Sequence, residues 1–255
     1  MTTSPVDNTG DDLPTHPTAV VGRILELYAQ GWFPMGDLER NAVEWVQPRR
    51  RAVLSLTPVR LHVARSLRSL VRRKRFEIRC DTAFEQVIVS CAQAERGGSW
   101  LHPAIVDWFL ELHRLGLAHS IEAWLREESD ERNPASSQPS ADSARLVGGL
   151  YGLSVGSVFC GESMFSNPAA GGSNASKVCF VHLISHLEVC GFAVLDSQIS
   201  NPHMHSLGVE EVPARAYLKK LRELSGLQRP WLPFDPERAL AAMEKWRAGQ
   251  EREGG

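Results

Sequence analysis

The chain has 255 residues, a formal net charge of −2, 43% hydrophobic and 23% charged residues, which are ordinary values for a soluble globular protein of one or two domains. No apolar run reaches the roughly eighteen residues of a membrane span, and the N-terminus lacks the basic and apolar segments of a secretory signal. The five cysteines are odd in number and lack C-x-x-C spacing. We therefore expect a cytoplasmic protein that has no membrane contact and no disulfides.

The first part of the chain is predicted to form a small N-terminal domain. Residues 1–17 are polar and Pro/Thr-rich, so we expect a disordered tail. Val20, Ile24 and Leu27 keep helical spacing, which predicts a helix over residues 19–30. The segment W-F-P-M-G (32–36) is interpreted as an aromatic turn, and a strand is expected over 52–56. Residues 18–75 are assigned to this domain.

Arginines dominate the end of this domain, and no acidic residue lies between Trp45 and Phe76. A helix is predicted over residues 58–73, and arginines three and four residues apart share one face of it. Planar guanidinium groups can engage two phosphate oxygens at once, so the run is a candidate phosphate-binding surface. A merely solvated helix face is the alternative. The candidate residues are Arg49, Arg50, Arg51, Arg65, Arg68, Arg72 and Arg75.

Residues 76–255 are predicted to form one larger mixed α/β domain. Strands are expected over 76–80 and 118–125, a helix capped by Asp81 follows the first, and another begins at Pro103. Residues 127–144 are polar and Pro/Ser-rich, which indicates a mobile insertion. His182 and His186 are four residues apart but lack a third ligand, so we expect no metal site. Asp235 is predicted to cap the last helix.

The stretch from residue 146 to 198 holds the candidate chemistry. Two apolar runs broken by glycines predict a hairpin, and G-E-S-M-F-S (161–166) is interpreted as a polar turn that carries Glu162. N-A-S-K (174–177) begins a helix, and F-A-V-L-D-S-Q (192–198) is predicted to be a strand. If these strands are neighbours, Glu162, Asp196 and Gln198 share one rim of a sheet. On spacing alone, a loop-capping Asp and an ordinary Gln remain the more common alternatives.

Several motifs occur in one fixed order: G-W-F-P-M (31–35), P-R-R-R-A-V-L (48–54), S-W-L (99–101), F-C-G-E-S-M-F-S (159–166), N-A-S-K (174–177) and L-D-S-Q (195–198). On these motifs the chain resembles the leucyl/phenylalanyl-tRNA–protein transferase family over about residues 20–220. The resemblance implies a small N-terminal domain and a larger domain like the acetyltransferase superfold, with a mixed twisted sheet. It also implies transfer of Leu, Phe or Met from aminoacyl-tRNA to the N-terminal Lys or Arg of acceptor proteins, marking them for N-end-rule degradation. We expect a monomer that needs no cofactor and no metal.

The resemblance also assigns roles to residues. Gln198 would accept or orient the acceptor amine, Asp196 would orient or polarise Gln198, and Glu162 would hold the acceptor cation. An aminoacyl ester is already activated, so the task is mainly one of proximity. Whether Asp196 and Gln198 relay a proton or only position groups stays open. The implied substrate-binding residues are Trp100 and Phe109 for the 3′ adenosine, with Phe159, Met164, Ser166, Leu183, Leu195 and Asn201. The arginines would bind the tRNA acceptor stem.

Two alternatives remain. One is a related transferase that uses the same scaffold with another donor, such as a different aminoacyl-tRNA or an acyl-CoA; the chain lacks a Q-x-x-G-x-G pyrophosphate loop, which argues against acetyl-CoA. The other is a non-catalytic RNA-binding module built around the arginine face.

Overall fold

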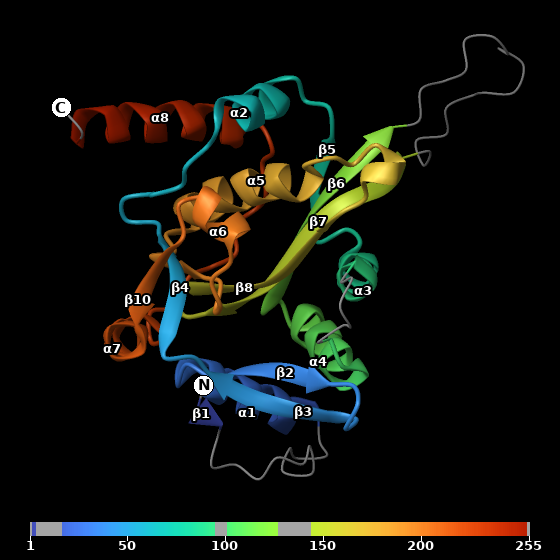
Figure 1. Ribbon diagram of the computed structural model, residues 1–255, viewed down its shortest axis with the longest axis vertical. Coiled ribbons are helices and arrows are strands. Elements are labelled where there is room, and N and C mark those ends of the chain that lie inside the picture. The colour runs from blue at the N-terminus through green and yellow to red at the C-terminus, as the bar shows by residue number, and fades with distance from the viewer. Residues whose placement is uncertain (1, 4–16, 95–100, 127–143, 254–255) are drawn as a thin grey trace, which may run out of the picture.

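A computed structural model describes residues 2–3, 17–94, 101–126 and 144–253. Within these ranges the chain forms two sheets and eight α-helices (Figure 1). The smaller sheet has the order β1-β3-β2, and the larger one has the order β10-β4-β9-β8-β7-β6-β5. The predicted mixed α/β fold class with a mixed sheet is confirmed, whereas the small N-terminal sheet was not predicted. Most of the predicted tail and nearly all of the predicted insertion lie outside the described residues.

The N-terminal unit consists of α1 (Pro17–Ala29) and the antiparallel strands β1 (Thr2–Thr3), β2 (Phe33–Asp37) and β3 (Ala42–Gln47). The predicted helix is confirmed, and Gly31 follows it with a φ of +85°. The predicted turn at residues 32–36 is wrong, because Phe33 and Pro34 pair with Val46 and Trp45 of β3. The sequence pattern had not predicted β3 as a strand. The tail prediction is also wrong for Thr2 and Thr3, which pair with β3.

The large sheet contains β4 (Arg50–Ser55), β5 (Glu77–Cys80), β6 (Ala118–Arg126), β7 (Ala144–Val155), β8 (Val158–Ser166), β9 (Val194–Asp196) and β10 (Glu210–Pro213). All neighbours are antiparallel except β8 and β9, which are parallel. The segment G-E-S-M-F-S is therefore the second half of β8 and not a turn. Since β4 pairs with β9 and β10, a strand from before residue 75 lies in the larger sheet; the domain boundary itself stays a prediction.

Helices cover both faces of the large sheet (Figure 1). One face carries α5 (Ala175–Cys190), which also contacts α2 (Arg65–Arg72) and α8 (Arg238–Glu253). Almost every residue of α5 is buried, because the helix lies between the sheet and this outer layer. The other face packs against α1, α3 (Phe84–Ala94) and α4 (Pro103–Arg114). The short α6 (Pro202–Ser206) and α7 (Ala214–Leu224) flank β10 in sequence.

Two predicted helix starts are wrong. The helix expected from residue 58 begins at Arg65, because the preceding backbone is used elsewhere: Val59 forms a bridge to Leu56, and the His62 N–H donates to the Leu207 carbonyl. Asp81 does not cap α3; its carboxylate accepts the Ser120 N–H instead. The buried Glu122 carboxylate, from β6, accepts the N–H groups just before α3. Within the described ranges, no helix is long and apolar enough to cross a membrane.

Candidate active site

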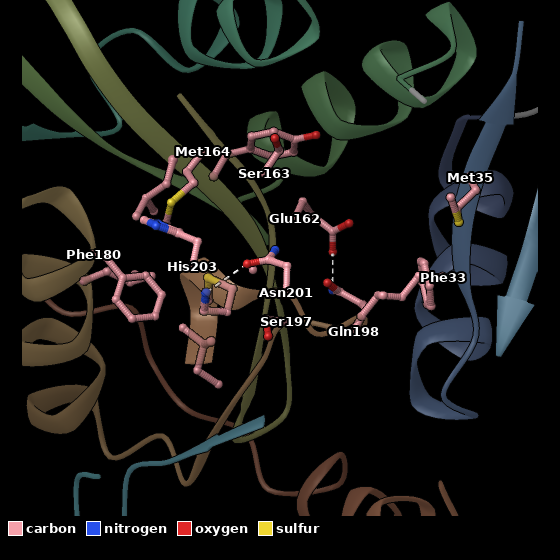
Figure 2. Close-up of a pocket in the computed structure, with 17 residues that line it drawn as sticks. Phe33, Met35, Glu162, Ser163, Met164, Phe180, Ser197, Gln198, Asn201 and His203 are labelled. Carbon is pink, nitrogen blue, oxygen red and sulfur yellow. Dashed lines mark hydrogen bonds between the residues drawn. The ribbon is translucent and has the colours of Figure 1, made fainter. Parts of the chain in front are cut away.

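The candidate site lies where the parallel strands β8 and β9 separate. Cys160 of β8 lies opposite Asp196 of β9, and this is the last residue pair between the two strands. Glu162 follows Cys160 by two residues, and Gln198 follows Asp196 by two residues. The Gln198 Nε2 donates a hydrogen bond to Glu162 Oε1 at 3.3 Å (Figure 2). The structure therefore brings these two residues together at one rim of the sheet, where ligands commonly bind in α/β proteins.

Glu162 is the extra residue of a β-bulge. Tyr151 of β7 pairs with Ser163, and Gly152 pairs with Gly161, so Glu162 has no partner in this ladder. A bulge bends its strand and can redirect a side chain, and bulges are common beside active sites. A Cβ at Gly152 would overlap the Cys160 carbonyl and the Phe159 ring, so only glycine fits opposite the bulge.

A cavity of about 370 Å³ opens beside the Glu162–Gln198 contact. In Figure 2 Met164 and Phe180 lie on one side of the Glu162–Gln198 contact, and Phe33 and Met35 lie on the other. The size falls within the range of pockets that bind small molecules. The apolar wall comprises Leu150, Met164, Phe180, Leu183, Leu195, Ile199 and Met204, and Phe33 and Met35 of β2 line the cavity on the side of the N-terminal unit. The polar groups are Glu162, Ser163, Ser197, Gln198, Asn201 and His203.

Asp196 lies behind this cavity and does not line it. It is fully buried, and its carboxylate accepts hydrogen bonds from Arg51 at 2.8 and 2.7 Å and from the Tyr217 hydroxyl at 2.6 Å. It also accepts the Gln198 backbone N–H at 3.0 Å. The contact between Asp196 and Gln198 thus goes through the backbone, whereas the Gln198 side chain turns to Glu162.

The environment of Glu162 favours its protonated form. Burial raises the pKa of its carboxyl to about 8, and the Asp196 charge adds to this. The nearby Tyr28 hydroxyl and the Arg51 guanidinium act in the opposite direction and only partly offset burial. An α-amine has a pKa of about 7.7–8, so Glu162 and an incoming amine are matched as proton acceptor and donor.

The eight predicted substrate-binding residues divide into three groups. Met164, Leu183, Leu195 and Asn201 line the cavity. Phe159, Phe109 and Ser166 do not: Phe159 packs on Phe192 and Trp231, Phe109 packs on Tyr151, and the Ser166 hydroxyl bonds to Ser176 at the start of α5. Trp100 lies outside the described residues. Lining residues that were not predicted include Phe33, Met35, Phe180, His203 and Met204; the alternation of Phe33 and Met35 on one strand face was a usable signal.

The predicted arginine surface is more heterogeneous than its sequence pattern. Arg49, Arg65 and Arg75 are exposed, and Arg75 donates to the Gly171 carbonyl. Arg50 pairs with Glu211 of β10 at 2.9 Å, and Arg72 pairs with Glu244 of α8. Arg68 is part-buried and donates to the Val63 carbonyl. Acidic residues distant in the sequence therefore neutralise some of these arginines, although the run itself contains no acidic residue.

The assignment of Arg51 to this surface is wrong. Its side chain is 2% exposed, and its guanidinium lies over the Phe33 and Tyr217 rings at 5.0 and 4.8 Å from their centroids. The Asp196 carboxylate holds it in the interior, where it cannot reach a phosphate. The described residues contain no group of three or more His, Cys, Asp or Glu side chains arranged to hold a metal ion.

Comparisons with known proteins agree on one family. The family model for leucyl/phenylalanyl-tRNA protein transferase matches residues 55–222, and the model for its N-terminal domain matches residues 21–49. A relative of this name from Chlorobaculum tepidum is 42% identical over 205 residues, covering 80% of this chain and 94% of the relative. Another from Edwardsiella ictaluri is 40% identical over 217 residues, covering 83% and 78%.

Among solved structures, a crystal structure of FemX aligns with a TM-score of 0.49 and 11% identity, covering 75% of this chain and 66% of that one, a likeness too weak to add to the description of the fold. The family models and the relatives at about 40% identity are sufficient by themselves. The chain belongs to the leucyl/phenylalanyl-tRNA–protein transferase family.

Proposed function

We propose that this protein transfers Leu, Phe or Met from aminoacyl-tRNA to the N-terminal Lys or Arg of acceptor proteins. The observation that carries the proposal is the Glu162–Gln198 contact in a cavity that also has an apolar wall. The reaction needs no cofactor, because the aminoacyl ester is already activated. Its product carries a destabilising N-terminus for degradation, and the setting is the cytoplasm, where charged tRNA is available.

The apolar wall suits the side chain of the donor amino acid. Met164, Leu183 and Leu195 offer no polar atom that would require a partner on the substrate, apart from the weakly polar thioether. Such a pocket distinguishes side chains that differ by one methylene by only about 1–3 kcal/mol. Because this discrimination is weak, we expect the enzyme to use several donor amino acids whose side chains are unbranched at Cβ.

The polar side suits the acceptor amine. The Gln198 Nε2 is engaged by Glu162, which leaves the Gln198 Oε1 to accept a hydrogen bond from the incoming amine. Glu162 holds the ammonium and takes its first proton. The amine nitrogen then attacks the ester carbonyl carbon, the new C–N bond forms, and the bond from that carbon to the ribose oxygen breaks. The second amine proton neutralises the ribose oxygen, and the proton on Glu162 returns to solvent.

The exposed arginines suit the tRNA. Arg49, Arg65 and Arg75 would contact backbone phosphates in a sequence-independent manner, as guanidinium groups commonly do. Arg50 and Arg72 would first have to exchange their carboxylate partners for phosphates, so we assign them a smaller share.

The test incubates the purified protein with tRNA charged with radiolabelled leucine and with a peptide that begins with Arg. Labelled peptide is expected, and the same peptide with an acetylated N-terminus should remain unlabelled. Tight tRNA binding without transfer would instead favour the RNA-binding module. Transfer from another charged tRNA or from an acyl-CoA, but not from leucyl-tRNA, would favour the related transferase.

A further inference from the structure

We propose that Arg51 and Tyr217 are positioning residues of the transfer reaction: they hold Asp196, and Asp196 holds the Gln198 backbone so that the Gln198 amide faces Glu162. The inference rests on the proposed function, because it concerns the same site. It gives Asp196 a role that excludes proton relay. It also gives Arg51 an interior role in place of the surface role suggested by its position in an arginine run.

The Asp196 carboxylate has no capacity left for a substrate proton. Its Oδ1 accepts from the Arg51 Nε at 2.8 Å and from the Gln198 N–H at 3.0 Å. Its Oδ2 accepts from the Arg51 Nη2 at 2.7 Å and from the Tyr217 hydroxyl at 2.6 Å. The Cys160 thiol also donates to Oδ2, with the sulfur at 3.9 Å, so the roughly four lone-pair sites of the carboxylate are all engaged. Asp196 and Arg51 are both fully buried, and Asp196 does not line the cavity.

Arg51 connects this carboxylate to the N-terminal unit. Its third nitrogen, Nη1, donates to the Gly31 carbonyl at 2.9 Å, just after α1. The Phe33 ring, which lines the cavity, and the Tyr217 ring flank the guanidinium plane. Guanidinium groups favour such aromatic flanks together with paired carboxylate contacts. One buried side chain thus fixes Asp196 relative to the wall of the substrate cavity.

Gln198 needs this support because of its backbone. Its φ is +54°, in the left-handed region that residues other than glycine rarely adopt. Such a conformation persists where surrounding contacts over-determine it. Here the Asp196 Oδ1 accepts the Gln198 N–H, and the Ala52 N–H, next to Arg51 on β4, donates to the Gln198 carbonyl at 3.1 Å. Displacing Asp196 therefore releases the residue that contacts Glu162.

The first test is Tyr217→Phe, which keeps the ring and removes only the hydroxyl. We expect kcat for leucyl transfer to fall about tenfold, while KM for leucyl-tRNA and for the Arg-peptide changes less than about twofold. The backbone amide hydrogen of Gln198 should exchange with solvent faster in the variant, and this measurement does not depend on transfer activity. A purely structural role would lower the fraction of folded enzyme but leave kcat per active site and the exchange of this backbone amide unchanged.

The control for the Arg51→Met substitution described next is Arg114→Met, because Arg114 is an exposed arginine on α4, away from the cavity.

The second test separates positioning from proton relay. Asp196→Asn keeps an oxygen that can accept the Gln198 N–H but leaves Arg51 as an unpaired buried charge, so kcat should fall about a hundredfold. Arg51→Met combined with Asp196→Asn removes that charge and should recover at least about tenfold of the loss. No recovery in the double variant, or a Tyr217→Phe enzyme with wild-type kcat and wild-type Gln198 exchange, would overturn the inference. A wild-type enzyme that transfers nothing would contradict the proposed function instead, and the exchange measurement would still report on the positioning.

Discussion

The cavity and the arginine surface are built on opposite principles. Beside the cavity, Glu162 and Gln198 hold each other's side chains, and behind Gln198 the Asp196 carboxylate accepts two bonds from Arg51, one from Tyr217 and one from the Gln198 N–H. On the surface, Arg49 and Arg65 are exposed, whereas Arg50 and Arg72 share carboxylates supplied by β10 and α8. Reaction at a single carbonyl requires pre-organised groups, but binding a polyanion tolerates mobile charges. Substitutions should therefore have steep effects in the first region and graded effects in the second.

The largest expected effect is in the cavity. Gln198→Ala and Glu162→Ala should each lower the rate of leucine transfer about 10²–10³-fold, because each removes a group that orients the amine or takes its proton. Single-turnover transfer from leucyl-tRNA to an Arg-peptide measures this. Rates within about threefold of wild type for both variants would show that this contact does not serve the reaction, and the contrast with the surface would disappear.

The apolar wall should control the choice of donor. Met164→Ala enlarges the cavity, so we expect the ratio of phenylalanine to leucine transfer to rise about tenfold, within the 1–3 kcal/mol that such pockets discriminate. Competition between the two charged tRNAs measures the ratio. Met243→Ala is the matched control, because Met243 is buried in α8 and does not line the cavity. An equal change in both variants would mean that stability, and not the shape of the wall, sets the ratio.

The pH dependence should report on Glu162. With its pKa raised to about 8, the carboxylate form grows with pH while the ammonium form of the acceptor declines, so kcat/KM for the Arg-peptide should rise about two- to threefold between pH 7 and 8. It should fall at higher pH as the acceptor loses its own proton in solution. Glu162→Gln should lack the rising limb that the wild type shows. An unchanged limb in that variant would assign the titration to another group.

The same shift predicts the effect of pH on stability. Between about pH 5 and 8 the folded protein retains a Glu162 proton that the unfolded chain has released, so the free energy of unfolding falls as pH rises. The slope is at most about 1.4 kcal/mol per pH unit. Urea unfolding of the wild type and Glu162→Gln at several pH values measures the difference. A difference that does not vary with pH would contradict the raised pKa.

The smallest effects are expected on the surface. Arg65→Ala should weaken tRNA binding a few-fold and reduce the slope of log K against log salt by about one. Glu244→Gln frees Arg72 and should strengthen binding by a similar or smaller factor. Filter binding over a range of salt concentrations measures both. An unchanged salt slope in Arg65→Ala would identify that side chain as merely solvated, and the comparison would then rest on fewer arginines.

Some of the site follows from sequence patterns, and the reason is topological. Glu162 and Gln198 lie two residues beyond paired positions of parallel strands, so once the hairpin and the next strand are recognised, their convergence is expected. Met164, Leu183 and Leu195 were named from the resemblance to the family and not from periodicity, and they do line the cavity. The convergence of Glu162 and Gln198, in contrast, depended on the order of the strands, which local sequence carries.

Other parts depended on partners that local sequence does not show. Arg51 sits among similar arginines, and only its place on β4 opposite β9 turns it toward Asp196. The turn expected at residues 32–36 is a strand because β3 pairs with it. The acids that neutralise Arg50 and Arg72 lie far along the chain, on elements that fold back beside them. Runs of charged residues and aromatic segments therefore predicted the positions of side chains less well than the ends of predicted strands did.

The extra residue in β8 has a consequence for how this chain can vary. Deleting one residue between Gly161 and Ser163 would restore an uninterrupted ladder with β7, yet it would leave no carboxylate facing Gln198. On the proposed function, the better-paired strand would belong to an inactive protein. The length of this strand would then be constrained by chemistry more tightly than by folding, which residue identity alone does not capture.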